Sequence, residues 1–179
     1  KQLCTLAYLH TYNPPINLKI ASNITTLFCP IEMDRGNPIS LKNNNKPVAN
    51  ALARWQSASK NLFVWDYTVQ FANYMSPFPN LSYFEENYTT FKANNVKGLF
   101  VQGYADVPGD FSELRQYLLA KLLWDASIDV KATTADFLRG FYGKAASEIE
   151  NYLKLLSENQ KKSKAYLDIY SGPVQNRTT

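Results

Sequence analysis

The chain has 179 residues, a formal net charge of +4 and 45% hydrophobic residues, which is ordinary for a globular protein with one sizeable core. No block of like charges and no nucleic-acid-binding motif occurs, so the sequence argues against nucleic-acid binding. The sequence contains no run of about 18 apolar residues, so it predicts no membrane span. Because the sequence starts on a strand-like segment without methionine or signal peptide, we expect a processed or truncated fragment.

Four apolar runs each end on polar residues, which is typical of buried parallel strands that emerge at one edge of a sheet. The runs are LAYLHTY at 6–12, LFCPIE at 27–32, LFVWDY at 62–67 and LFVQGY at 99–104. We expect the first two strands to cover 4–12 and 24–32. A polar stretch from Asp34 to Lys46 follows the second strand and predicts a loop.

Apolar residues at helical spacing predict a helix after each of the later strands. The first begins near Pro47, the second covers about 82–94, and the third follows Asp110, which with Glu113 predicts a capping box. Two more helices are expected at about 131–141 and 144–159, and disorder from about residue 171.

The alternation of strands and helices favours parallel strands with right-handed crossovers. The predicted fold is α/β: half of a TIM-type (β/α)8 barrel, with four parallel strands, crossover helices and extra C-terminal helices. A small open sheet is the alternative. The predicted domain covers residues 1–160, and residues 161–179 form a partly disordered extension.

The two cysteines, Cys4 and Cys29, fall near opposite ends of neighbouring predicted strands. At about 3.3 Å per residue they lie roughly 15 Å apart, which is too far for a disulfide. We expect both to be small buried apolar residues.

Polar residues at the carboxyl ends of parallel strands converge at one edge of the sheet, so Glu32, Asp66, Gln102 and His10 are predicted to face a common pocket. Most glycosidases need two carboxyl groups about 5–9.5 Å apart. Neighbouring strands lie about 4.8 Å apart, so Glu32 and Asp66 are the catalytic candidates. The structural alternatives are a Glu32 paired with Arg35 and an Asp66 that accepts bonds from loop amides.

Other residues near these strand ends are predicted to contact substrate. Gln102 and His10 suit sugar hydroxyl groups, although a lone histidine also fits a structural role. Tyr104 and Tyr74 are candidates for stacking, and Asp106 for binding a hydroxyl group. Trp65 and Tyr67 alternate away from Asp66, so they are expected in the helix-facing core.

Several long motifs carry a resemblance: FCPIE, VWDYTVQFANYMSPFPN, VKGLFVQG and ELRQYLLAKLLWD followed by DFLRGFYGKAA. They resemble a bacterial family known only as a domain of unknown function and frequent in gut Bacteroidetes, over about residues 6–156. That family is similar to the C-terminal half of glycoside-hydrolase barrels such as α-glucuronidases and β-hexosaminidases. The resemblance implies glycan handling and a secreted, periplasmic or cell-surface location, and it supplies no catalytic residues.

A single histidine excludes a multi-histidine metal site within this chain, and no GxSxG, GxGxxG or P-loop motif occurs. We therefore expect no metal and no cofactor. Three functions stay open. The first is acid/base hydrolysis of a glycosidic bond, and the second is carbohydrate binding without catalysis. The third is a protein-interaction module whose open edges pair with a missing N-terminal half-barrel or a second copy of the chain.

Overall fold

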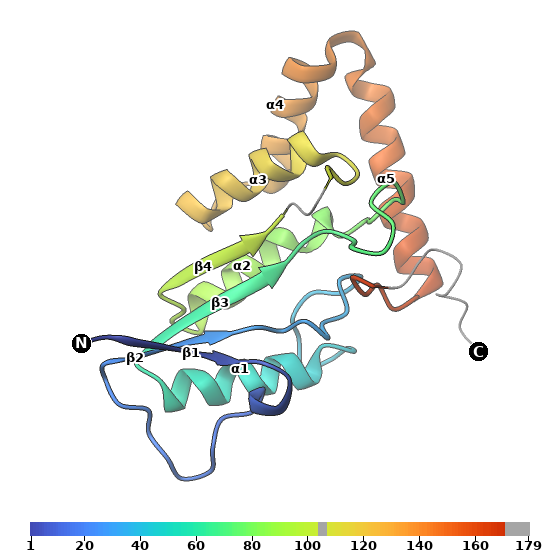
Figure 1. Cartoon of the computed structure of the whole chain (residues 1–179). Helices are drawn as coiled ribbons and strands as arrows, with labels where there is room; N and C mark the ends of the chain where they lie inside the picture. The colour runs from blue at the N-terminus through green and yellow to red at the C-terminus, as the bar shows by residue number, and fades with distance from the viewer. Residues whose placement is uncertain (104–106, 171–179) are drawn as a thin grey trace.

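The computed structural model describes residues 1–103 and 107–170. Its centre is one four-stranded parallel sheet in which the strands follow their order in the sequence (Figure 1). The strands are β1 (Leu3–Ala7), β2 (Ile24–Phe28), β3 (Asn61–Tyr67) and β4 (Gly98–Gln102). The prediction of four parallel strands is confirmed. The first two strands are shorter than predicted because the 3₁₀ turn η1 (Leu9–Thr11) follows β1 and a turn follows β2.

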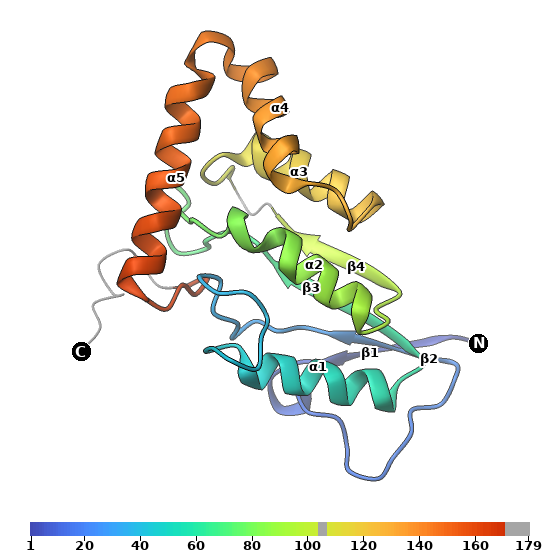
Figure 2. The ribbon, with the colours of Figure 1, turned by 180° about the vertical axis from the view of Figure 1, so that it is seen from behind.

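A helix follows each of the last three strands, as expected. These helices are α1 (Lys46–Ala58), α2 (Phe84–Ala93), which the 3₁₀ turn η2 (Leu81–Tyr83) precedes, and α3 (Ser112–Trp124). Helix α2 lies behind β3 and β4 in Figure 1 and in front of them in Figure 2, so one face of the sheet is covered. We call it the helix face, and the opposite side the open face.

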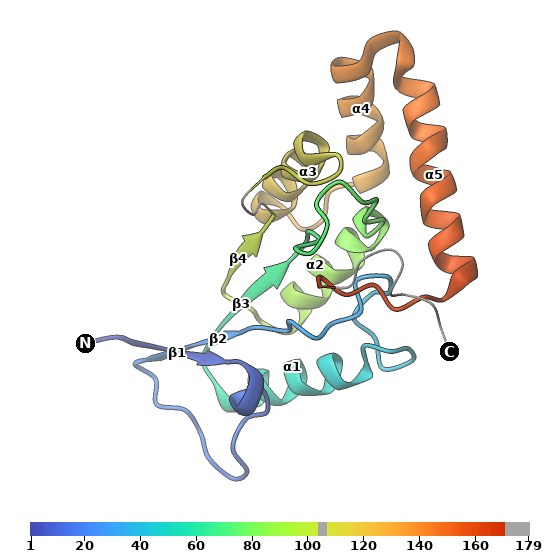
Figure 3. The same cartoon turned by 45° about the vertical axis from the view of Figure 1, so that its right-hand side comes forward.

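The C-terminal part forms a helical hairpin of α4 (Val130–Tyr142) and α5 (Ala146–Ser163), joined by the 3₁₀ turn η3 (Gly143–Ala145). The side chain of Asp129 caps α4 by accepting a hydrogen bond from the Ala132 amide at 2.8 Å. Helix α5 runs back toward the carboxyl ends of the strands (Figure 3). Among the described residues, no helix is long and apolar enough to cross a membrane.

Two apolar clusters fill the space between the helix face and the helices. The first joins Ala7, Phe28, Leu62 and Val64 of the strands to α1 and α2, and the second joins α2 and α3 to the α4–α5 hairpin. Leu118 of α3 lies in the second cluster and is fully buried.

Side chains alternate between the two faces along β3. Leu62 and Val64 lie in the helix-face core, and Asp66 follows them by the same alternation. Trp65 and Tyr67 belong to a separate cluster, and Trp65 pairs in register with the exposed Phe100. The expectation that Trp65 and Tyr67 lie in the helix-facing core is wrong, because the covered face is the one that Asp66 shares.

Two further expectations also need correction. Asp110 forms no capping box, because α3 begins at Ser112 and no side chain caps it. The Asp110 carboxylate instead accepts hydrogen bonds from the Arg115 guanidinium at 2.7 Å and the Phe78 amide at 2.8 Å. Both cysteines are free, as expected, but only Cys29 is buried and Cys4 is exposed.

Candidate functional site

The loops that follow the four strand ends form the predicted site edge, which we call the rim. Glu32 lies in the turn after β2, and its residue is exposed to solvent. Asp66 lies one residue before the end of β3 and is only 3% exposed. The two predicted catalytic carboxylates therefore sit in different surroundings, one in water and one within the protein.

Asp66 is paired with Arg35 in a buried salt bridge. Arg35 Nη1 donates to Asp66 Oδ1 at 2.5 Å, and the Tyr67 amide donates to the same oxygen at 2.9 Å. Arg35 Nη2 also donates to the carbonyl of Pro30 at 2.7 Å. A buried charge needs such partners, and these bonds commit Asp66 to holding the loop after β2 against β3. The structural alternative for Asp66 thus fits this geometry, while its catalytic role stays a prediction.

A second carboxylate, Asp34, organises the same loop and is fully buried. Its Oδ1 accepts hydrogen bonds from the amides of Gly36 at 2.9 Å and Leu167 at 3.0 Å. Its Oδ2 accepts from the side chains of Asn37 and Asn44. The Asp34 carboxylate has its donors within the protein and fixes the loop.

Arg115 plays the same role after β3 and β4. Its Nη1 donates to the carbonyl of Thr68 at 2.9 Å and to the side chain of Asn80, and its Nη2 pairs with Asp110 at 2.7 Å. Burial lowers the pKa of Arg115, and the nearby Asp110 carboxylate opposes that change. Both arginines near the rim are therefore used to fix loops.

Aromatic side chains form a continuous row from the open face to the rim. Trp65 packs edge-on against Phe100 at a centroid distance of 4.8 Å and stacks beside Tyr67 at 6.1 Å. Tyr67 contacts Phe71 at 6.3 Å, and Phe71 contacts Tyr170 at 6.0 Å. We call these five residues the aromatic row. Its two ends are exposed, since Phe100 keeps 52% and Tyr170 60% of its surface in solvent.

Gln102 lies on the open face with the aromatic row. Its Oε1 accepts a hydrogen bond from the Trp65 indole Nε1 at 3.1 Å, which fixes the orientation of the indole ring. His10 lies in η1 and is exposed, while Tyr74 is half-buried in the loop after β3. Tyr104 and Asp106, which were also predicted to contact substrate, lie outside the described residues.

Phenol groups surround Glu32 at the rim. The Tyr166 hydroxyl donates to the Glu32 carbonyl. Burial, followed by the charge of Glu32, raises the pKa of Tyr12. Tyr8 has a raised pKa, caused first by burial and then by Tyr170 and Glu32. Tyr8 and Tyr12 flank η1, so the charge of Glu32 acts on phenols at both ends of this turn, and the C-terminal segment contacts the Glu32 backbone through Tyr166.

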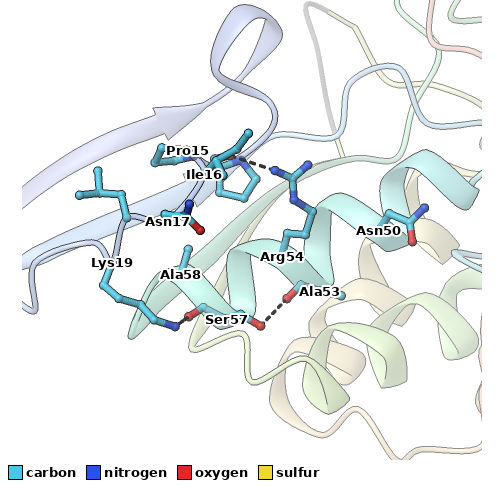
Figure 4. A pocket seen from close by; sticks show the side chains of 11 residues that line it. Pro15, Ile16, Asn17, Lys19, Asn50, Ala53, Arg54, Ser57 and Ala58 are labelled. Atoms are coloured by element: carbon cyan, nitrogen blue, oxygen red, sulfur yellow. Dashed lines mark hydrogen bonds between the residues drawn. The ribbon is translucent and has the colours of Figure 1, made fainter.

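A separate hollow lies away from the rim. It measures about 980 Å³ and lies between the loop 14–19 and the outer side of α1 (Figure 4). Lys19 closes one side by donating to the Ser57 carbonyl at 2.6 Å, and Arg54 donates to the Pro14 carbonyl at 3.1 Å. Its lining contains no carboxylate, so it offers no acid/base pair. No group of three histidine, cysteine or acidic side chains suited to a metal occurs in 1–103 and 107–170.

Aromatic residues near the rim were expected from the sequence, but their extension to Phe100 and Tyr170 and the contact of Tyr166 with Glu32 were not. A signal for the row was present in β3, where aliphatic Leu62 and Val64 alternate with aromatic Phe63 and Trp65. For the C-terminal segment, the signal was the alternation of apolar Leu167 and Ile169 after a polar helix end.

Comparison with known families gives one match. The model of the family described as "Domain of unknown function (DUF4838)" matches residues 1–154. No curated protein and no solved structure matches this chain.

Proposed function

From the premise that this chain belongs to the DUF4838 family of domains of unknown function, we propose that it is a carbohydrate-binding part of a glycoside-hydrolase-like barrel. The observation that carries the proposal is the aromatic row beside Glu32 and Gln102. A sugar ring presents C–H groups on its faces and hydroxyl groups at its edge. Aromatic faces match the first, and carboxylate and amide groups match the second.

The aromatic row also has the stiffness that a binding surface requires. Trp65 and Tyr67 lie on β3, where pairing in register with Phe100 and Gln102 of β4 fixes the backbone. The Gln102 side chain holds the Trp65 ring, and Phe100 contacts its edge. A surface that is ordered before the ligand arrives loses little entropy on binding, which favours affinity.

Binding fits this geometry better than hydrolysis does. Hydrolysis requires a second carboxyl group that can exchange protons with substrate or water. Asp66 is buried and its Oδ1 already accepts bonds from Arg35 and the Tyr67 amide. Glu32, in contrast, is exposed and can meet a ligand. Under this proposal Glu32 accepts hydrogen bonds from sugar hydroxyls, and Asp66 holds the rim loop.

The test is titration of the intact chain with a panel of soluble oligosaccharides, followed by calorimetry and by tryptophan fluorescence. We expect a Phe100→Ala variant to weaken binding at least tenfold, because Phe100 is an exposed end of the aromatic row and contacts Trp65. The matched control is Phe141→Ala, which removes a similarly exposed ring, 56% in solvent, from α4. We expect this control to leave affinity unchanged.

A panel in which no oligosaccharide binds the intact chain would overturn the proposal. Equal losses in Phe100→Ala and Phe141→Ala would also contradict it, because binding would then not depend on the aromatic row. Hydrolysis is tested in the same panel by product analysis. Turnover that Asp66→Asn abolishes while the variant stays folded and binds sugar would restore the paired-carboxylate mechanism in place of simple binding.

A further inference from the structure

The described chain does not end with α5 but continues across the rim. Residues 165–170, which we call the C-terminal strap, bury Leu167 to 7% and Ile169 to 0% exposure. These two side chains pack in one cluster with Cys29 and Ile31 after β2, and with Tyr67 at the end of β3. The strap therefore fills the space beside the two central strand ends (Figure 3).

Main-chain hydrogen bonds fix the strap in place. The Arg35 amide donates to the Leu167 carbonyl at 2.7 Å, and the Phe71 amide donates to the Ile169 carbonyl at 2.7 Å. The Leu167 amide in turn donates to Asp34 Oδ1. Both neighbouring rim loops thus form hydrogen bonds with the strap as they would with a further strand.

A close approach between α5 and the loop after β2 sets the position of the strap. A Cβ atom on Gly36 would lie 2.1 Å from Gln160 Nε2, so only glycine fits there without a shift. Gln160 Nε2 donates to the Ala165 carbonyl at 2.7 Å, at the start of the strap. Gly36 leaves room for Gln160, and the hydrogen bond from Gln160 helps to set the direction in which the strap leaves α5.

The strap brings new side chains to the candidate site. The Tyr170 ring is the last member of the aromatic row, and the Tyr166 hydroxyl binds the backbone of Glu32. Burial is the main cause of the raised pKa of Tyr166, and the charges of Asp34, Asp168 and Glu32 add to it. Acidic groups therefore surround this phenol, whereas Arg35 close by is buried and paired with Asp66.

We propose that the C-terminal strap is a wall of the glycan-binding surface, in which Tyr170 stacks on the ligand and selects neutral oligosaccharides over uronic-acid-containing ones. The inference rests on the carbohydrate-binding function proposed above. It assigns a role to a segment that lies beyond the family match, which ends at residue 154. The preference follows from charge, because a uronate carboxylate placed here would meet the like charge of Glu32, while the Arg35 guanidinium is already paired with Asp66.

The experiment compares three tyrosine variants of the full chain against neutral and uronic-acid-containing oligosaccharides of equal length. Tyr170→Ala should weaken binding of the neutral ligands at least tenfold, whereas Tyr170→Phe, which keeps the ring, should stay within about twofold. Tyr152→Ala is the matched control, because Tyr152 is an exposed tyrosine of α5, 42% in solvent, that does not belong to the aromatic row. Intact chain should bind neutral ligands at least tenfold more tightly than uronic ones.

A second variant tests the placement of the strap without altering any ligand contact. Gly36→Ala should displace Gln160, and amide hydrogen exchange should then become faster at Arg35 and Phe71, whose amides bind the strap. Affinity for neutral oligosaccharides should fall in the same variant.

The outcomes separate the two proposals. If Phe100→Ala weakens binding and Tyr170→Ala does not, the strap is no wall and the inference fails while the carbohydrate-binding function stands. Tighter binding of uronic ligands by intact chain would overturn the stated selectivity. If intact chain binds no oligosaccharide at all, both proposals fail together.

Discussion

The two faces of the sheet differ in what they are made of and in how they are held. The helix face carries aliphatic side chains, with Asp66 and Arg35 paired at its rim end. The open face carries Trp65 and Phe100, with few fixed polar contacts besides the bond from Trp65 to Gln102. Burial and charge pairing stabilise the first face, whereas the second leaves aromatic surface in solvent. We propose that the first face serves stability and the second serves ligand contact.

The largest expected effect is on the helix face. Asp66→Asn leaves the Arg35 guanidinium, which is 3% exposed, without its charge partner. We expect a loss of about 3–5 kcal/mol in the free energy of unfolding, measured in urea. The matched control is Asp136→Asn, which breaks an exposed salt bridge to Arg139 and should cost under about 0.5 kcal/mol. Equal losses of unfolding free energy in the two variants would show that burial does not increase the contribution of the Asp66–Arg35 salt bridge.

A second test uses the apolar core behind the same face. Leu118→Ala removes a fully buried side chain of α3 and should cost about 2–5 kcal/mol in unfolding free energy. Leu123→Ala on the same helix removes a side chain that is 47% exposed and should cost under about 1 kcal/mol. A small loss for Leu118→Ala in denaturant melts would contradict the packing of α3 described above.

Alkaline pH tests the cluster in which Cys29 packs with Tyr67 and the C-terminal strap. Burial raises the pKa of the Cys29 thiol from its ordinary value of 9.0 to about 11. The unfolded chain then loses this proton at a lower pH than the folded protein does. The contribution is therefore complete below pH 9 and is lost as pH rises toward 11.

This loss should be visible in urea unfolding of reduced protein at a series of pH values between 8 and 11. The decline in unfolding free energy should be shallower in Cys29→Ala than in the intact chain. Identical slopes for the two proteins would show that the Cys29 thiol keeps an ordinary pKa.

A small change in stability is expected at Phe100. Its ring is 52% exposed, so Phe100→Ala should lower the free energy of unfolding by under about 1 kcal/mol, although it weakens ligand binding. Thermal melts of the two proteins, run beside the sugar titrations, give both values. A loss above about 3 kcal/mol would place Phe100 among core residues and remove the contrast between the two faces.

Periodicity was enough to predict the parallel sheet, the helix after each of the last three strands and two further helices near the C-terminus, because each apolar pattern is long. It predicted which residues share a face of β3 but not which face the helices cover. Both faces carry apolar side chains: Leu62 and Val64 on one, Phe63 and Trp65 on the other. The residue types on the two faces of β3 therefore could not show that Asp66 lies on the face that the helices cover.

The errors at the rim have a different cause. The expected second strand ran to Glu32, whereas β2 ends at Phe28 and a turn carries Glu32 into solvent. The spacing of Asp110 matched a capping box, but its carboxylate forms a salt bridge with the buried Arg115 guanidinium instead. In both places there is also a contact between residues distant in the chain, from the Phe78 amide to Asp110 and from the Tyr166 hydroxyl to the Glu32 carbonyl, which no local rule can anticipate.

The bond from the Leu167 amide to Asp34 joins positions 133 residues apart. During synthesis the loop after β2 emerges long before its last hydrogen-bond donor exists. Until nearly the whole domain has left the ribosome, water must donate hydrogen bonds to the Asp34 carboxylate in place of the Leu167 amide. The rim is therefore expected to be among the last parts to mature, and a chain halted before residue 167 would hold a formed sheet with an unfinished rim.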